Sequence, residues 1–285
     1  MKAVKCDLDK AIINIGFVGA VFTAMILCFT ANVYTEASTG KTYSVMEAIF
    51  TLDKNIIRSN YELSSLSVFR KCLSGYITMF IPIITAFPYM VTFCAERNSG
   101  LMRFTISRTG KIRYCLSKFI SCTVSAGLSI MIGVMLFGAV SAVIFPDISA
   151  YDVPSDVMKL IFPQGVLGCT AGIIAASFLY GAISVMPAFF ISSFCKNPYI
   201  ITCLPFLAIY LWNTALDRLQ ITLVENQDME RLGKLSMFYP HSILSAVMNK
   251  VGDNTAGTVL FNCVYVVILL SLFLIIMNCR RDKGV

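Results

Sequence analysis

The chain has few charged residues and a single histidine. Charged side chains make up 14% of its 285 residues, whereas 57% are hydrophobic. A soluble domain carries roughly a quarter charged residues, so these apolar residues cannot all be hidden inside one water-facing globule. Because they also fall into long blocks, most of the chain is predicted to lie in lipid. The single histidine, His241, argues against a histidine-based metal site.

Sequence motifs for catalysis and nucleotide binding are also missing. The 11 cysteines form no C-x-x-C pair, and neither a G-x-S-x-G elbow nor an H-E-x-x-H motif occurs. The stretch 35–42 resembles a phosphate loop, but Thr35 stands where that motif requires glycine. We therefore expect no enzymatic activity, metal or cofactor on this chain. A disulfide between Cys72 and Cys169, both expected near the outer face, remains an alternative to free thiols.

Six apolar segments are long enough to span a bilayer. We predict an all-α membrane protein whose single transmembrane domain fills residues 1–285. The predicted spans are 11–33, 72–95, 119–145, 168–195, 198–216 and 255–279. The polar stretch 217–253 is predicted to be an outer loop. Its apolar part, 235–248, contains Pro240 and favours short helices at the outer interface over a seventh crossing.

The distribution of basic residues predicts the orientation of these spans. With both termini in the cytoplasm, the inner segments hold 13 of the 23 basic residues and four carboxylates, a net charge of +9. The outer segments hold the other ten basic residues and twelve carboxylates, a net charge of −2. Short cytoplasmic loops are usually the more basic ones, so cytoplasmic termini are favoured. Because the basic residues lie beside apolar segments, nucleic-acid binding is disfavoured.

The predicted spans carry no ionisable residue well inside the bilayer. A proton- or ion-coupled transporter usually keeps such a group at mid-membrane, and a voltage sensor needs a row of arginines there. Both classes are therefore disfavoured. Any large movement of this bundle would have to be driven from outside the chain.

The loop 96–118 combines one carboxylate, Glu96, with six basic residues. Gly100 follows a few positions later, and then come an apolar-basic stretch, Leu101-Met102-Arg103, the pair Ser107-Arg108, and Lys118 at the start of the third span. In this order and spacing the loop resembles that of the membrane subunit of ABC-2 type transporters. The six spans and the very short break at 196–198 agree with that layout. The family often has a proline after the apolar part, where this chain has Ser107-Arg108-Thr109-Gly110.

The resemblance implies a fold like that of type V exporters and a coupling helix seated in a cytoplasmic ATPase. The residues it assigns to this coupling loop are Glu96, Arg97, Gly100, Arg103, Arg108, Lys111 and Arg113. Two alternatives stay open. In the first, the basic side chains contact only anionic lipid headgroups and set the topology, and they do not bind an ATPase. Glu96 either pairs with a nearby base or is solvated at the interface.

The resemblance also implies a translocation path between two paired subunits, lined by the second and fifth spans. The candidates are Tyr76, Thr78, Thr85, Thr92, Tyr199, Thr202, Tyr210, Trp212 and Asn213. For each residue, interhelical hydrogen bonding or a place in an interfacial aromatic belt is the alternative.

Taken together, the resemblance implies a permease subunit in a prokaryotic plasma membrane. Its partners would be a second six-helix permease, identical or related, two cytoplasmic ABC ATPase subunits that bind ATP and Mg²⁺, and membrane lipid. Hydrophobic peptides, drugs or lipids are the expected cargo. The alternatives are a peptide-sensing or immunity module of the same fold and, less favoured because catalytic groups are missing, an intramembrane enzyme.

Overall fold

The computed structural model is an elongated bundle of helices. It describes residues 2–36, 40–151, 154, 158, 162, 164–226, 228–249 and 255–279. Within these residues, five helical segments are long and apolar enough to cross a membrane, and a bent pair near the N-terminus brings the number to six. The multi-pass membrane architecture predicted from the sequence is therefore supported. Part of the stretch 146–159, which the predicted topology places in an outer loop, and the terminal Arg280 and Arg281 lie outside the described residues.

The N-terminal third differs most from the prediction. One continuous span was expected over 11–33, but the chain forms α1 (Lys2–Ile12) and α2 (Ile15–Cys28), bent by 57° at the break between them. Asn14 causes the break, because its backbone is extended and its side-chain oxygen accepts from the Gly16 N–H at the start of α2. The residues after α2 form strand β1 (Asn32–Thr35) instead of continuing the helix.

A small segment that contains two short strands follows α2. Strand β1 pairs antiparallel with β2 (Thr42–Ser44), and Ser44 then caps the next helix. Ser44 and Glu47 bond each other reciprocally in a capping box. The hydrogen bonds from Ser44 hold the pKa of Glu47 below its usual range. The helices of this segment are α3 (Val45–Thr51), α4 (Lys54–Ser59), η1 (Tyr61–Leu63) and α5 (Ser65–Lys71).

The second predicted span is a broken helix, as its prolines indicated. It comprises α6 (Tyr76–Ala86), which contains Pro82, and α7 (Met90–Asn98). Next come α8 (Leu101–Thr109) and α9 (Lys111–Ile144). The third span was predicted to begin at residue 119, but the helix begins eight residues earlier, at Lys111.

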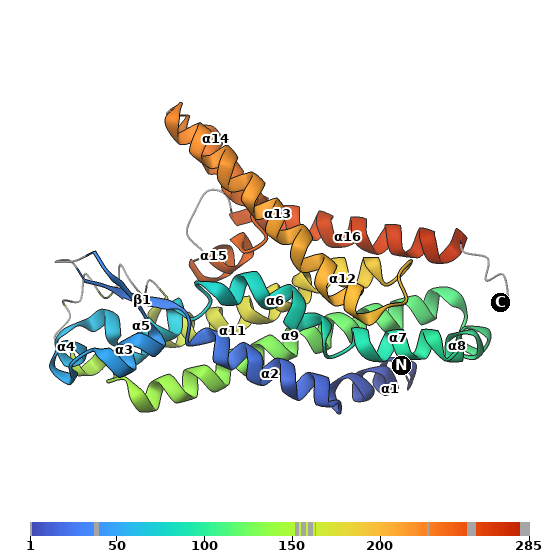
Figure 1. Ribbon diagram of the computed structural model, residues 1–285, viewed down its shortest axis with the longest axis horizontal. Helices are drawn as coiled ribbons and strands as arrows, with labels where there is room; N and C mark the ends of the chain where they lie inside the picture. Colours follow the sequence, from blue (N-terminus) through green and yellow to red (C-terminus); the bar gives the residue numbers. More distant parts are fainter. Residues whose placement is uncertain are drawn as a thin grey trace.

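The remaining helices complete the bundle. They are η2 (Ile148–Ala150), α11 (Gly165–Ser184), α12 (Met186–Ile191), α13 (Pro198–Glu225), α14 (Met229–Leu235), η3 (Ser236–Phe238), α15 (Ser242–Asn249) and α16 (Thr255–Cys279). The short helices predicted between the fifth and sixth spans are present. The fifth helix, α13, continues nine residues beyond the predicted limit of 216, and with α14 it projects from the bundle (Figure 1).

Helix α9 is the central packing element, with α2 and α11 beside it. Glycine lets these backbones approach closely. A Cβ on Gly133 would lie 2.8 Å from the Cβ of Ala24 in α2, and one on Gly127 would lie 2.8 Å from the Phe178 ring in α11. Cys72 and Cys169 are both free thiols, so the proposed disulfide between them is absent.

Candidate functional site

Helix α8 is set off from its neighbours by two glycines. Gly100 has φ +74° and ψ −1°, and Gly110 has φ +80° and ψ 148°. Both conformations are strained for residues with a side chain, and the second is nearly exclusive to glycine. The chain can therefore turn sharply at each end of α8 and hold this nine-residue helix as a separate element between α7 and α9.

One face of α8 is packed against the bundle and the other is free of it. Met102 is buried and Ile106 is half-buried, one helical turn apart. The opposite face carries Phe104, which is 72% exposed, with Arg103 and Arg108 beside it. An exposed aromatic ring flanked by two guanidinium groups is typical of a contact surface, because arginine and aromatic residues are enriched in protein interfaces.

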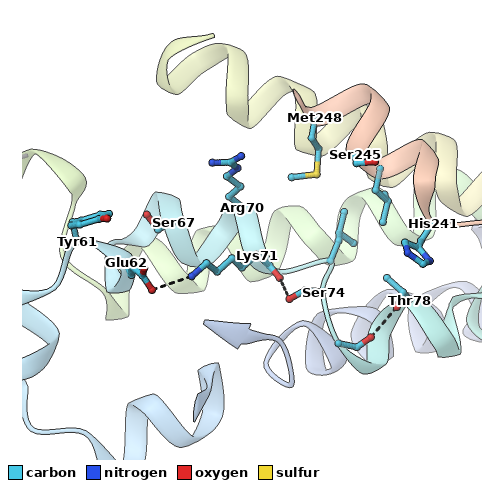
Figure 2. A pocket seen from close by; sticks show the side chains of 13 residues that line it. Tyr61, Glu62, Ser67, Arg70, Lys71, Ser74, Thr78, His241, Ser245 and Met248 are labelled. Carbon is cyan, nitrogen blue, oxygen red and sulfur yellow. Dashed lines mark hydrogen bonds and ion pairs between the residues drawn. The ribbon is translucent and has the colours of Figure 1, made fainter. Parts of the chain in front are cut away.

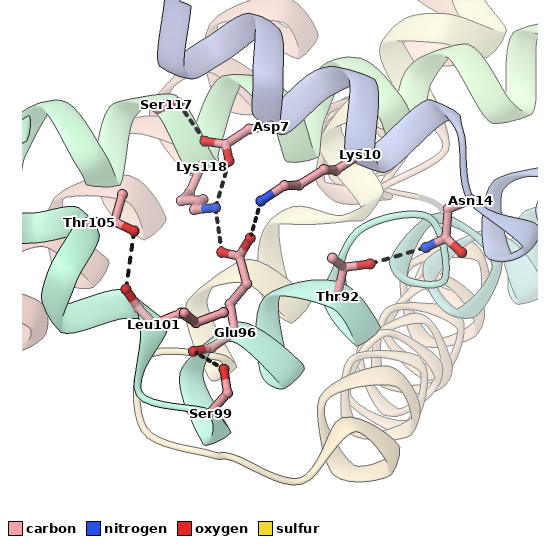
Figure 3. Close-up of polar contacts among 10 residues, drawn as sticks. All are labelled: Asp7, Lys10, Asn14, Thr92, Glu96, Ser99, Leu101, Thr105, Ser117 and Lys118. Carbon is pink, nitrogen blue, oxygen red and sulfur yellow. Dashed lines mark hydrogen bonds and ion pairs between the residues drawn. The ribbon is translucent and has the colours of Figure 1, made fainter.

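A cluster of four charged residues anchors the neighbouring helices (Figure 3). Lys118 in α9 is only 3% exposed, and its Nζ lies 2.8 Å from Asp7 Oδ1 and 2.6 Å from Glu96 Oε2. The other oxygen of Glu96 lies 3.2 Å from Lys10 Nζ. Ser117 donates to the second oxygen of Asp7 at 2.7 Å. We call Asp7, Lys10, Glu96 and Lys118 the anchor cluster.

The anchor cluster is electrically balanced, with two cations and two carboxylates. Removing a lysine from water costs several kcal/mol, so Lys118 is tolerated inside the protein only because both carboxylates meet it. The rings of Tyr89 and Tyr114 complete its surroundings, with centroids 5.8 and 5.2 Å from Nζ. The cluster thereby ties α1 to α7 and α9. Of the two alternatives for Glu96, pairing with a base is the one observed.

Arg97 is turned inward, away from solvent. Its guanidinium donates to the backbone carbonyl of Ser192, to that of Cys195 at 2.9 Å and to that of Ser193 at 3.0 Å. These carbonyls lie just after α12, which ends at Ile191. The neighbouring Asn98 side chain also reaches the carbonyl of Lys196, at 3.5 Å. Arg97 therefore fastens the start of the coupling loop to the α12–α13 connection.

At one end of the molecule, α1, the loop 96–118 and the α12–α13 connection, which charge counting assigned to the same side, meet the end of α16. α1 joins the loop through the anchor cluster, and the α12–α13 connection joins it through Arg97. Lys111 Nζ donates to the carbonyl of Asn278, near the end of α16, at 3.2 Å. In Figure 1 the N-terminus, α8 and the last turns of α16 lie at this end. We call it the basic end.

The comparisons with known proteins give no family for this chain. No protein-family model matches it, and no curated protein matches it. Assignment of a function therefore depends on the residues and contacts of the basic end and on the residues predicted to line a translocation path.

The seven residues predicted for the coupling loop fall into three groups. Glu96, Arg97 and Gly100 shape and anchor the loop, whereas Arg103 and Arg108 lie exposed on α8. Lys111 and Arg113, predicted to belong to the loop, are in the first turn of α9. Arg113 is exposed there, and Lys111 bonds α16. Fewer of the seven predicted residues are therefore exposed for contact with a partner than the sequence indicated.

The candidate path residues come from α6, α7 and α13, and α13 packs against both of the other helices. Phe80 in α6 and Phe206 in α13 stack with centroids 5.5 Å apart. Thr85 and Thr202 are buried and bond carbonyls of their own helices, at 2.8 and 3.0 Å for the shortest contacts. These bonds lie within one helix, so neither threonine shows the interhelical hydrogen bonding that was the alternative for each candidate.

The remaining path candidates differ in their surroundings. Thr92 accepts a hydrogen bond from Asn14 Nδ2 at 3.0 Å, and Thr78 Oγ1 donates to the carbonyl of Gly75. The aromatic candidates lie on the outside of the subunit and are Tyr76, Tyr199, Tyr210 and Trp212. The indole N–H of Trp212 donates to the carbonyl of Phe238 at 3.1 Å. Asn213 has a buried side-chain oxygen with no hydrogen-bond partner among the described residues.

Asp7 and Lys10 are the functional candidates that the sequence reading missed. Residues 2–10 hold three lysines and two aspartates without a motif, so local composition does not single out these two. The signal in the sequence that could have identified them is their spacing along a helix. Asp7 and Lys10 are three positions apart on α1, a spacing that puts both on one helical face, where they reach Lys118 and Glu96.

Proposed function

We propose that this chain is the permease subunit of an ATP-driven ABC-2 type transporter, and that α8 is its coupling helix. The observation that carries the proposal is the pairing of an exposed α8 face with a firmly anchored frame. Phe104, Arg103 and Arg108 face outward, while the anchor cluster and Arg97 fix both sides of the loop. A force applied to α8 would be transmitted to α1, α7, α9 and the α12–α13 connection rather than absorbed by a loose loop.

ATP and Mg²⁺ would bind on a separate cytoplasmic ATPase beneath the basic end. The chain itself carries no nucleotide-binding motif, so hydrolysis is assigned to that partner. The basic end would face the cytoplasm of a prokaryotic cell, in agreement with its excess of lysine and arginine. A second six-helix permease, identical or related, would pair with this one in the plasma membrane.

The path would form between the two permeases, along α6 and α13. The exposed side chains of Tyr76, Tyr199 and Tyr210 support this placement, because they offer aromatic surface beyond the subunit's own core. Amphipathic cargo, such as a hydrophobic peptide, a drug or a lipid, would suit walls of this kind.

The proposal is tested by reversing charge on the exposed face of α8. Arg103→Glu with Arg108→Glu should abolish co-purification of the ATPase while the protein still inserts and remains monodisperse. The matched control is Arg58→Glu with Lys54→Glu, which reverses two exposed charges on α4 at the opposite end. Unchanged ATPase binding in the α8 double variant would rule out the coupling role.

A second candidate function, sensing of an external peptide, is favoured by the projecting arm. α13 extends to Glu225 and α14 follows it outside the bundle (Figure 1). The arm is braced at its base, since Tyr239 donates to Asp217 Oδ1 at 2.8 Å. A sensor would bind peptide through this arm without moving it across the membrane. Measurement of cargo transport together with cargo-stimulated ATPase activity separates the two functions.

A further inference from the structure

A cavity of about 710 Å³ lies at the opposite end of the bundle from the anchor cluster. Its walls come from η1, α5, the turn before α6, and α15 (Figure 2). Small-molecule sites in proteins usually have volumes of about 300–1,000 Å³, so this cavity is large enough for a headgroup. None of its lining residues belongs to the basic end, and only Thr78 was considered for the path.

Basic side chains predominate among the charged residues of the lining. Arg70 and Lys71 face it, against the single carboxylate of Glu62, whereas burial lowers the pKa of His241 and keeps that imidazole neutral. Lys71 is already engaged, because its Nζ lies 2.7 Å from the carbonyl of Val33 and 3.3 Å from Glu62 Oε2. Lys71 therefore compensates the charge of Glu62, and the pocket favours an anionic ligand.

Arg70 is the residue best suited to hold such an anion. It extends from α5 into the same space as Met248 from α15 (Figure 2), and its guanidinium lies 5.9 Å from the Phe162 ring centroid. A guanidinium has five N–H donors, so it can keep existing contacts and still bind two oxygens of a phosphate.

The other wall of the cavity is apolar. Leu73 and Leu244 are buried at its base, and Met248 lies beside them. This wall stands just before Tyr76, where the membrane-spanning segment Tyr76–Asn98 begins. The end of a span is where a phospholipid changes from phosphate to acyl chain, so a cavity beside it suits both parts of such a lipid. A pocket of this size accommodates a headgroup and its first carbons but not a folded peptide.

We propose that this cavity binds an anionic membrane phospholipid. Arg70 contacts the phosphate, and Leu73, Leu244 and Met248 pack against the glycerol and the first acyl carbons. The site belongs to one subunit and does not require the ATPase, so it stands or falls independently of the proposed transport function.

The test is native mass spectrometry of the full chain, purified in mild detergent and washed free of lipid. It is titrated with phosphatidylglycerol, with phosphatidylcholine of the same chains, and with inorganic phosphate. The wild-type protein should bind phosphatidylglycerol about tenfold more tightly than phosphatidylcholine, because the choline ammonium group offsets the phosphate charge and leaves phosphatidylcholine with no net charge to attract Arg70. Inorganic phosphate should not displace the lipid at equal concentration.

Three variants locate the site. Arg70→Gln should remove the preference for phosphatidylglycerol, whereas Arg70→Lys should keep part of it. Arg58→Gln removes the same charge from exposed α4 outside the cavity and should bind like the wild type. Ser245→Phe fills the cavity from an exposed position on α15 and should weaken both lipids without changing charge.

Several results would overturn the proposal. Equal loss of preference in Arg58→Gln would show a general charge effect instead of a site. Unchanged phosphatidylglycerol binding in both Arg70→Gln and Ser245→Phe would exclude the cavity. Displacement of the lipid by equimolar inorganic phosphate would assign the anion to a free phosphate rather than to a membrane lipid. Because Ser245→Phe leaves the buried core intact, it decides the matter even if Arg70→Gln fails to fold.

Discussion

Lys118 Nζ and Glu96 Oε2 lie 2.6 Å apart and join the first turns of α9 to the end of α7. The same ammonium group meets Asp7 of α1, so one buried cation holds three helices at the basic end. This arrangement makes the loop that carries α8 part of a rigid frame.

The first prediction concerns the contribution of the Lys118 ion pairs to the stability of the protein. Lys118→Met should lower the free energy of unfolding by about 3–5 kcal/mol, because Asp7 then loses its buried cation and Glu96 keeps only Lys10. Lys10→Met, in the same cluster but half-exposed, should cost less than about 1 kcal/mol. Thermal unfolding in detergent checks both. Equal shifts in the two variants would show that burial of Lys118 does not matter.

The second prediction concerns the fastening of the α12–α13 connection. Arg97→Gln removes the guanidinium donors that satisfy the carbonyls of Ser192, Ser193 and Cys195. The connection should loosen, and maleimide should label the partly buried Cys195 several times faster. Arg103→Gln, exposed on α8, is the matched control and should leave that rate unchanged. Identical labelling rates in all three proteins would contradict the capping role of Arg97.

The third prediction concerns the turn before α8. Gly100→Ala should destabilise the protein by about 1–2 kcal/mol, because φ is +74° although the space around the position is open. Gly19→Ala has equally open surroundings but lies within helix α2, where alanine is favoured. It should be neutral or slightly stabilising. A neutral Gly100→Ala variant would mean that the turn tolerates a side chain and is not fixed.

The fourth prediction concerns the latch at the base of the projecting arm. Burial, with the hydrogen bond to Asp217 and the charge of that carboxylate, raises the pKa of Tyr239 to about 12. The hydroxyl therefore stays protonated and keeps donating throughout the physiological range. Tyr239→Phe should increase hydrogen exchange in η3 and at the arm's base at any pH from about 6 to 9. A wild-type latch that opened within that range would contradict the raised pKa.

The sequence was sufficient to locate the apolar helices but not their breaks. Lipid requires long charge-free segments, so the six blocks were visible, and α16 has the predicted bounds of 255–279. The bend before α2 was not visible, because it depends on Asn14 bonding Thr92, which lies 78 positions further along the chain. The amino-acid composition around Asn14 does not indicate a partner so far away in the sequence.

In the candidate site, too, local features could be predicted from the sequence and long-range contacts could not. Gly100 and the exposed basic residues of α8 were recognised, since turn chemistry and charge are local properties. The burial of Lys118 was not, because lysine at the start of a span ordinarily extends its charge to the interface. Only the folded arrangement brings Asp7 from α1 and Glu96 from α7 to the same ammonium group.

The central claim is that a separate ATPase drives this chain through α8, and solubilisation from native membranes tests it most directly. The protein is captured in mild detergent after brief crosslinking, and the proteins that accompany it are identified and quantified. The account predicts a small cytoplasmic ATPase with a phosphate-binding loop, in equal amount to the permease and lost in the Arg103→Glu, Arg108→Glu variant. Capture of the crosslinked chain alone, or only with partners that lack ATPase activity, would contradict it.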